Sequence, residues 1–144
     1  MQKIFTTNIE KNTVENIVYR KVLHTTNKMQ LVIMSIPPLS YISLEIHPTH
    51  DQFIKIEHGE CVVLIYDGNK ILIDKIQLQS GWSIIIPANT WHEVKNLSSL
   101  MPVKLYTIYT PPEHKKDRLD VDNPDLHKHA ICTNKYKLVL THKN

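Results

Sequence analysis

Residues 44–59, LEIHPTHDQFIKIEHG, and residues 81–96, GWSIIIPANTWHEVKN, are the two stretches that decide the fold of this chain. In the first, Glu45 and His47 are two positions apart in an apolar–polar alternation, a spacing that in a strand turns both side chains to one face. A turn-prone break, PTHD, follows, and a second alternation opens at Gln52. The pattern predicts a strand, a sharp corner and a strand that bring these three side chains around one point.

The second stretch adds a histidine, His92, just beyond a strand that stops at Pro87. A carboxylate, two imidazoles and an amide oxygen form a first shell that suits a divalent cation and leaves room for water or substrate. The predicted metal ligands are Glu45, His47, Gln52 and His92. The alternative, a barrel with these groups inside and no ion, is disfavoured because buried charges without partners are costly.

Two of these positions keep an alternative role. Gln52 either binds the ion or hydrogen-bonds His47 or a bound water. His50, in the corner between the two strands, either takes the place of Gln52 or is exposed at the rim, which we favour. Asp51 is expected to cap the turn through a local side-chain contact.

Short alternating or β-branched runs, bounded by turn residues, recur along most of the chain. They predict strands at 19–23, 29–36, 41–47, 52–57, 61–66, 70–76, 81–86, 93–96 and 103–109. Asp67-Gly68 between two such runs is the clearest hairpin signal, and Thr7 or Asn8 is a candidate cap for a short helix through Val14. Many short strands with few helical windows indicate an all-β sandwich or barrel.

One domain is expected over residues 1–144, with its barrel core at about 29–112. Residues 113–125 are charged and aperiodic, which predicts an irregular tail lying over the barrel. Residues 136–141, YKLVLT, alternate and are predicted to form one more strand. That strand either closes an edge of its own barrel or pairs across a homodimer.

Composition excludes several classes of protein. The chain is 42% hydrophobic and 22% charged, without an apolar run near the roughly 18 residues of a membrane helix. No secretory signal is visible at the N-terminus, so a cytoplasmic location is expected. A formal charge of +3 with scattered lysines does not indicate nucleic-acid binding. Cys61 and Cys132 stand far apart and are expected to be idle thiols.

The two stretches resemble the signature motifs of the cupin superfamily, the small double-stranded β-helix proteins. The second motif, G-x5-P-x-G-x2-H-x3-N, is matched by Gly81, Pro87, His92 and Asn96 at full spacing. Asn89 replaces its middle glycine, and asparagine tolerates the left-handed backbone expected there.

The first cupin motif, G-x5-H-x-H-x3,4-E-x6-G, is matched with substitutions. Glu45, His47, Gln52 and Gly59 stand in the places of His, His, Glu and Gly, and Ser40 or a neighbour replaces the opening glycine. The resemblance implies an all-β cupin, or jelly-roll, barrel with a short helical or irregular N-terminal segment, and a homodimer.

Finer texture, DQFIKIEHGE and KLYTIYTPPEH, is similar to single-domain cupins described as "mannose-6-phosphate isomerase-like". Phosphomannose isomerases share the fold and bind zinc through two His, one Glu and one Gln. The resemblance therefore implies a metal-dependent isomerase or epimerase of a small sugar, with zinc favoured. Glu45 and Tyr109 are the candidate catalytic residues, Tyr109 as a proton donor or hydrogen-bond partner if it faces the barrel, although core packing is at least as consistent with its position.

Other functions stay open at this point. With iron, manganese, nickel or copper the same ligands would suit a dioxygenase, and a non-catalytic module that binds a small molecule is also consistent. A phosphorylated substrate requires a cationic clamp, and neither Arg20 nor Arg118 lies in the motif core. A second metal cluster formed by His114, His127, His129 and Cys132 is not expected.

Overall fold

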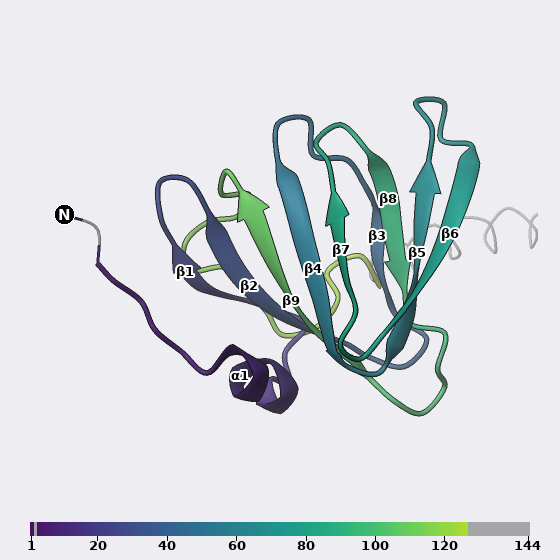
Figure 1. Cartoon of the computed structure of the whole chain (residues 1–144). Helices are drawn as coiled ribbons and strands as arrows, with labels where there is room; N and C mark the ends of the chain where they lie inside the picture. The colour runs from purple at the N-terminus through teal and green to yellow at the C-terminus, as the bar shows by residue number, and fades with distance from the viewer. Residues whose placement is uncertain (2, 127–144) are drawn as a thin grey trace, which may run out of the picture.

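The chain folds into two antiparallel sheets that face each other, as the alternating runs predict (Figure 1). The computed structural model describes residue 1 and residues 3–126. In this part of the chain one helix, α1 (Ile9–Glu15), precedes the strands. The strands are β1 (Arg20–Thr25), β2 (Gln30–Ile36), β3 (Tyr41–Glu45), β4 (Asp51–His58), β5 (Glu60–Tyr66), β6 (Leu72–Gln79), β7 (Ser83–Ile86), β8 (Trp91–Lys95), β9 (Val103–Thr110) and β10 (Leu119–Asp120).

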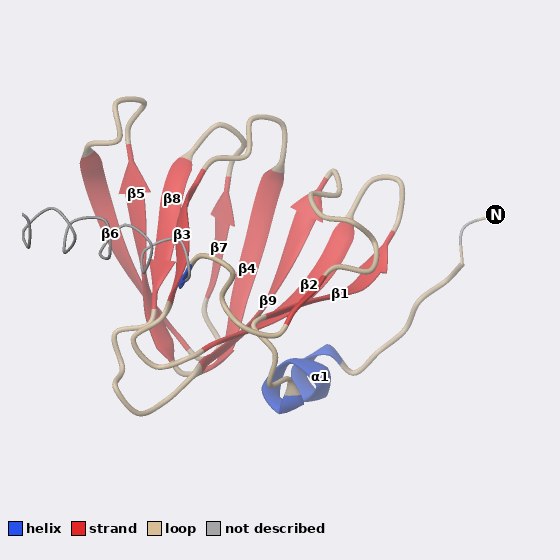
Figure 2. Cartoon of the chain, turned by 180° about the vertical axis from the view of Figure 1, so that it is seen from behind, coloured by secondary structure: helices blue, strands red, loops and turns tan. Residues whose placement is uncertain are grey.

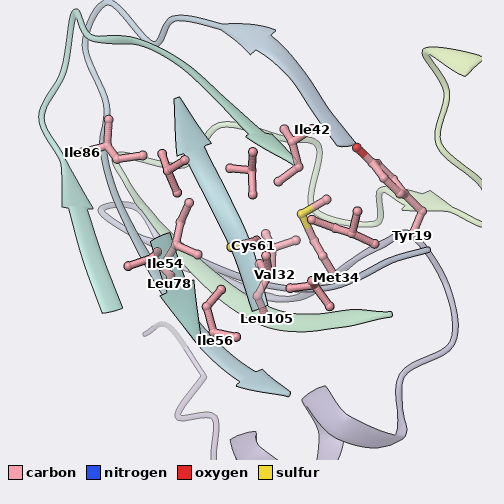
Figure 3. Close-up of a cluster of buried hydrophobic side chains, with 14 of the residues drawn as sticks. Tyr19, Val32, Met34, Ile42, Ile54, Ile56, Cys61, Leu78, Ile86 and Leu105 are labelled. Carbon is pink, nitrogen blue, oxygen red and sulfur yellow. The ribbon is translucent and has the colours of Figure 1, made fainter. Parts of the chain in front are cut away.

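The strand order is that of a jelly roll. One sheet runs β10-β1-β2-β9-β4-β7 and the other β3-β8-β5-β6, so the chain crosses repeatedly between the sheets. Apolar side chains from both inner faces fill the space between them (Figure 3). The predicted all-β barrel is confirmed, with shifted boundaries: β3 ends at Glu45 rather than His47, and β6 extends to Gln79.

The register arranges the inner face of the larger sheet in rows. One row, completely buried, is apolar and consists of Ile56, Leu105 and Met34. Four residues along each strand lies an equally buried row of polar residues, Gln52, Tyr109 and Gln30. In the smaller sheet Glu45 pairs with His92. We call these regions the apolar end and the polar end of the barrel.

The motif positions have clear backbone roles. Asn89 has φ +63°, the left-handed conformation expected where it replaces glycine. Gly59 has φ +83°, and a Cβ there would lie 2.7 Å from the Pro102 carbonyl oxygen. The buried amide of Asn96 donates to the carbonyls of Ile36 and Pro37, which ties β8 to the end of β2.

Local signals for the helix and the hairpin are also confirmed. Asn8 caps α1, because its side chain accepts from the Lys11 amide at 3.0 Å. Strands β5 and β6 form the predicted hairpin, whose turn is held by Asp67. In the described part of the chain no helix has the length and apolar character needed to cross a membrane.

Residues 111–126, which we call the strap, connect the free edges of the two sheets (Figures 1 and 2). Its strand β10 pairs with β1. Further on, Asn123 donates to the Tyr41 carbonyl at 2.8 Å, and Asp125 accepts from Ser43 at 2.6 Å, both on β3. The predicted tail over the barrel is therefore ordered and includes a short strand that was not predicted. The strand predicted at 136–141 lies outside the described residues.

Candidate metal centre

Three potential ligands meet at the polar end of the barrel. Glu45 is the last residue of β3, His92 lies opposite it on β8, and His47 follows β3 after the strand has ended. One ligand atom from each residue lies within 4.8 Å of the others. His47 and His92 are buried, whereas the Glu45 side chain is 27% exposed.

The spacing of these atoms suits a common ion. The Oε1 atom of Glu45 lies 3.3 Å from His47 Nε2 and 3.5 Å from His92 Nε2. Two ligand atoms that each bind one ion at about 2.1 Å, at a tetrahedral angle, lie about 3.4 Å apart. The three side chains therefore need little rearrangement to hold a cation.

Contacts on the far side of each imidazole fix which nitrogen faces the centre. His92 Nδ1 lies 2.9 Å from the Thr90 carbonyl oxygen, which can only accept, so Nδ1 carries the proton. His47 Nδ1 faces the Glu113 carboxylate at 3.5 Å. In the neutral rings both Nε2 atoms therefore present a lone pair to the centre, as metal binding requires.

Gln52 also directs an acceptor towards the centre. Its amide nitrogen donates to Thr107 Oγ1 at 3.1 Å and to the Tyr109 hydroxyl at 3.2 Å. Its oxygen then lies 3.0 Å from His92 Nε2. The neighbour of the Gln52 oxygen is thus His92, not the His47 considered for it.

Glu45, His47 and His92 thus bring three acceptor atoms within 4.8 Å of one another, and Gln52 places a fourth 3.0 Å from His92 Nε2. Buried acceptors that face one another repel unless a proton or a metal ion lies between them. The donor set of nitrogen and oxygen atoms suits a borderline divalent cation.

The charges of the centre are strongly coupled. Burial opposes ionisation of Glu45, but hydrogen bonds and positive charge from His47 and His92 outweigh it and lower the pKa of Glu45 to about 2. Burial lowers the pKa of His47, yet Glu45 and Glu113 together raise it above its ordinary value. Burial raises the pKa of Tyr109 far above its ordinary value of 10.0, so its hydroxyl is neutral.

The loop that carries His47 is tied to the loop that precedes β8 and His92. The Asn89 amide donates to the His47 carbonyl at 2.8 Å. Asp51 Oδ1 accepts from the Ala88 amide, also at 2.8 Å. The prediction that Asp51 caps its own turn was wrong, because its carboxylate reaches across to the loop before β8.

The strap contributes residues that the motifs did not reveal. Glu113 contacts His47 and also lies 3.3 Å from His50 Nε2, which in turn is 3.1 Å from the Pro112 carbonyl oxygen. His50 is thus at the rim, as favoured, but it is paired and only 17% exposed. The sequence signals for Glu113 were its place shortly after β9 and within KLYTIYTPPEH, a stretch that gave it no role in the site.

Several other candidates are placed by the structure. Tyr109 faces the barrel and its ring contacts the rings of His47 and His114, at centroid distances of 5.5 and 5.1 Å. Trp91, the neighbour of His92 on β8, points to the outer face, where the Lys70 ammonium lies 4.5 Å from its ring centre. His127, His129 and Cys132 lie outside the described residues.

The fold and the site define a cupin. Residues 32–109, more than half of the chain, match the family model described as "Cupin domain". This chain belongs to the cupin family.

Similar proteins occur in a virus and in bacteria. The chain is 40% identical over 122 residues to protein L612 of Acanthamoeba polyphaga mimivirus, covering 85% of this chain and 74% of L612. It is 38% identical to YrkC of Bacillus subtilis over 78% of this chain and 60% of YrkC, so it spans less than two thirds of that relative. Among solved structures, BH2720 from Bacillus halodurans is 37% identical with a TM-score of 0.80, over 83% of this chain and 90% of BH2720.

Proposed function

We propose that this cupin binds one divalent cation, zinc being favoured, through Glu45, His47, His92 and the amide oxygen of Gln52. The observation that carries the proposal is the convergence of four acceptor atoms whose outward contacts leave their lone pairs facing inward. A bound divalent ion would polarise a carbonyl or hydroxyl group of a small molecule.

We propose further that the site is an isomerase or epimerase centre for a small sugar or a similar hydroxy-carbonyl compound. An isomerase moves a proton between neighbouring carbon atoms, and an epimerase removes a proton and returns it to the opposite face of the same carbon. Both need groups that hold substrate oxygen and exchange protons. Neutral Tyr109 is suited to donate a hydrogen bond to a substrate oxygen. Glu45 is ionised at neutral pH, and Glu113 beside His50 offers a second carboxylate at the rim, where protons exchange with solvent.

The ligand types support the mannose-6-phosphate isomerase-like subgroup as a further part of this proposal. Two histidines, a glutamate and a glutamine occupy the centre, with Glu45 and Gln52 in exchanged places relative to phosphomannose isomerases. The exchange leaves the charge of the ligand set unchanged. The substrate class is therefore tested separately from metal binding.

Metal binding is tested by elemental analysis of untagged protein. We expect about one divalent ion per chain in the wild type, and loss of that ion in His47→Ala and His92→Ala. His24→Ala is the matched control, because His24 stacks on Phe5 away from the centre. Unchanged metal content in both site variants would contradict the proposal.

The reaction is tested with aldose–ketose pairs, including mannose 6-phosphate, and with oxygen consumption measured in parallel. Interconversion that is lost in Tyr109→Phe with metal content retained supports isomerase chemistry. Substrate-dependent oxygen uptake would show a dioxygenase instead. Metal binding without turnover of any substrate would indicate a binding module.

A further inference from the structure

A second polar cluster lies between β1 and the strap, next to the candidate metal centre. Arg20 is 6% exposed and lies two positions before Val22, a core residue on the same strand. Its side chain therefore starts on the inner face of β1. Its Nη1 atom donates to Asp120 Oδ2 at 2.9 Å. The same carboxylate oxygen accepts from Arg118 Nε at 3.0 Å. Two guanidinium groups thus share one carboxylate, which leaves one positive charge without a counterion in the cluster.

His114 is joined to this cluster as a neutral ring. Arg118 Nη1 lies 2.9 Å from His114 Nδ1, and since arginine can only donate, Nδ1 accepts. The ring proton is then on Nε2. Burial, with the charges of Arg20 and Arg118, lowers the pKa of His114 to about 4, which keeps the ring neutral. Two hydrogen bonds between Gln30 and the His114 backbone, both 2.8 Å, hold the residue in place.

Two buried donors of the cluster lack acceptors. Among the described residues three buried side-chain polar atoms have no hydrogen-bond partner, and two of them are Arg20 Nε and His114 Nε2. Buried donors that stay unpaired cost about 1–3 kcal/mol each, and more when charged. Such a cost is commonly retained where a ligand supplies the acceptor.

The cluster adjoins the metal centre through Tyr109. The Tyr109 ring contacts His47 on the centre and His114 in the cluster, in both cases edge to face. Glu45 is also close enough to act on the pKa of Arg20 and of His114. The barrel therefore contains a centre that suits a metal ion and, beside it, a cluster whose free donors suit an anion. One small molecule with two polar groups could contact both.

We propose that Arg20 and His114 form an anion subsite that receives the carboxylate or phosphate group of the small molecule held at the metal centre. This inference rests on the proposed function and adds the substrate class: a small hydroxy or carbonyl compound that carries an anionic oxygen group. A guanidinium N–H and a neutral imidazole N–H are both donors, so they select acceptor oxygens and reject metal ions. Arg20 lies outside both cupin motifs, and the clamp sought near the motif core therefore comes from β1.

The test is calorimetric titration of zinc-loaded protein with glycerate, glycerol 3-phosphate and glycerol. The first two carry an anion and the third is the neutral comparison. We expect Arg20→Gln to weaken binding of at least one anion about tenfold or more, with glycerol unaffected. His114→Phe should weaken the same anion several-fold. Lys55→Gln is the matched control, because Lys55 is a cation paired with Glu57 on the outer face, and it should change nothing.

Each outcome decides a separate point. Loss of glycerate binding alone identifies a carboxylate, and loss of glycerol 3-phosphate binding alone a phosphate. The subsite is refuted if neither anion binds the zinc-loaded wild type at millimolar concentrations, or if both variants bind all three compounds as the wild type does. Should Arg20→Gln fail to fold by circular dichroism, His114→Phe decides. A protein that takes up no zinc defeats the proposed function, whereas zinc uptake without anion selectivity defeats only this inference.

Discussion

The apolar end and the polar end of the barrel are built from the same strands and are equally buried, yet they are held together differently. At the apolar end Ile56, Leu105 and Met34 make only dispersion contacts. At the polar end Gln52 and Gln30 lie in the same sheet at 1% and 0% exposure, and their amides need directed partners. The difference indicates that the apolar end serves stability, whereas the polar end serves binding at a cost in stability.

The polar end meets this demand with a network that reaches beyond the sheet. Gln52 donates to Thr107 and Tyr109, and Gln30 bonds Thr25 and the strap. An apolar side chain of similar size could occupy either position, as Ile56 and Met34 do four residues further along the same strands. A buried network of this kind is expected at a binding site and is unnecessary for folding alone. The following predictions test this division between the two ends.

Truncation at the apolar end should give the largest effect on stability. Leu105→Ala removes a fully buried side chain between Ile56 and Met34 and should lower the free energy of unfolding by about 2–5 kcal/mol. Urea denaturation of the metal-free protein measures it. Zinc stoichiometry of the folded variant should stay at about one, and its loss would show that the ends are not separable.

The turns at the apolar end should differ according to their surroundings. Gly59 and Gly81 both have positive φ, but only Gly59 has a backbone carbonyl where a Cβ would lie. Gly59→Ala should cost more than about 2 kcal/mol of unfolding free energy, and Gly81→Ala about 1 kcal/mol, since it meets only backbone strain. Equal denaturation midpoints for the two variants would contradict this reading.

At the polar end, Glu113 should act on metal affinity more than on stability. Glu113→Gln weakens the contact that keeps the proton on His47 Nδ1 and should reduce zinc affinity about 10- to 100-fold. Competition with a chromogenic chelator measures the affinity, and the unfolding midpoint of the metal-free variant should barely move. Glu60→Gln, at the exposed first residue of β5, serves as the control.

The smallest expected effect is a pH dependence of stability at the strap. The pKa of His114 falls from 6.5 to about 4 on folding, so the unfolded chain binds more protons between these values. Stability from this residue is complete above about pH 6.5 and is lost as the pH falls towards 4, by about 1–2 kcal/mol for a partly exposed group. In His114→Asn, thermal melts of the metal-free protein should show a shallower decline over this range. An identical slope would exclude His114 as its source.

Much of the site could be predicted because its central residues follow local patterns. Glu45, His47 and Gln52 lie on either side of one corner, and the turn there brings them together although β3 ends at Glu45, before His47. The helix cap at Asn8 and the left-handed Asn89 follow from single-residue preferences in the same way. Features that depend on residues close together in the sequence are therefore found in the structure much as predicted.

The remaining residues depend on topology. Arg20, Glu113 and His114 come from the first strand and the strap, and no local period relates them to the motifs. They meet only because β10 pairs with β1, between residues about one hundred positions apart. Asp51 shows the same limit on a smaller scale, since its partner was sought within its own turn and lies in the other loop.

The hydrogen bonds that join the Asn89 amide to the His47 carbonyl and the Ala88 amide to Asp51 have a consequence for metal selectivity. They fix the spacing of the two imidazoles before an ion binds. Such a preorganised site cannot widen for a larger ion without breaking these hydrogen bonds. Ionic radius should thus discriminate among divalent metals here more sharply than ligand chemistry alone would.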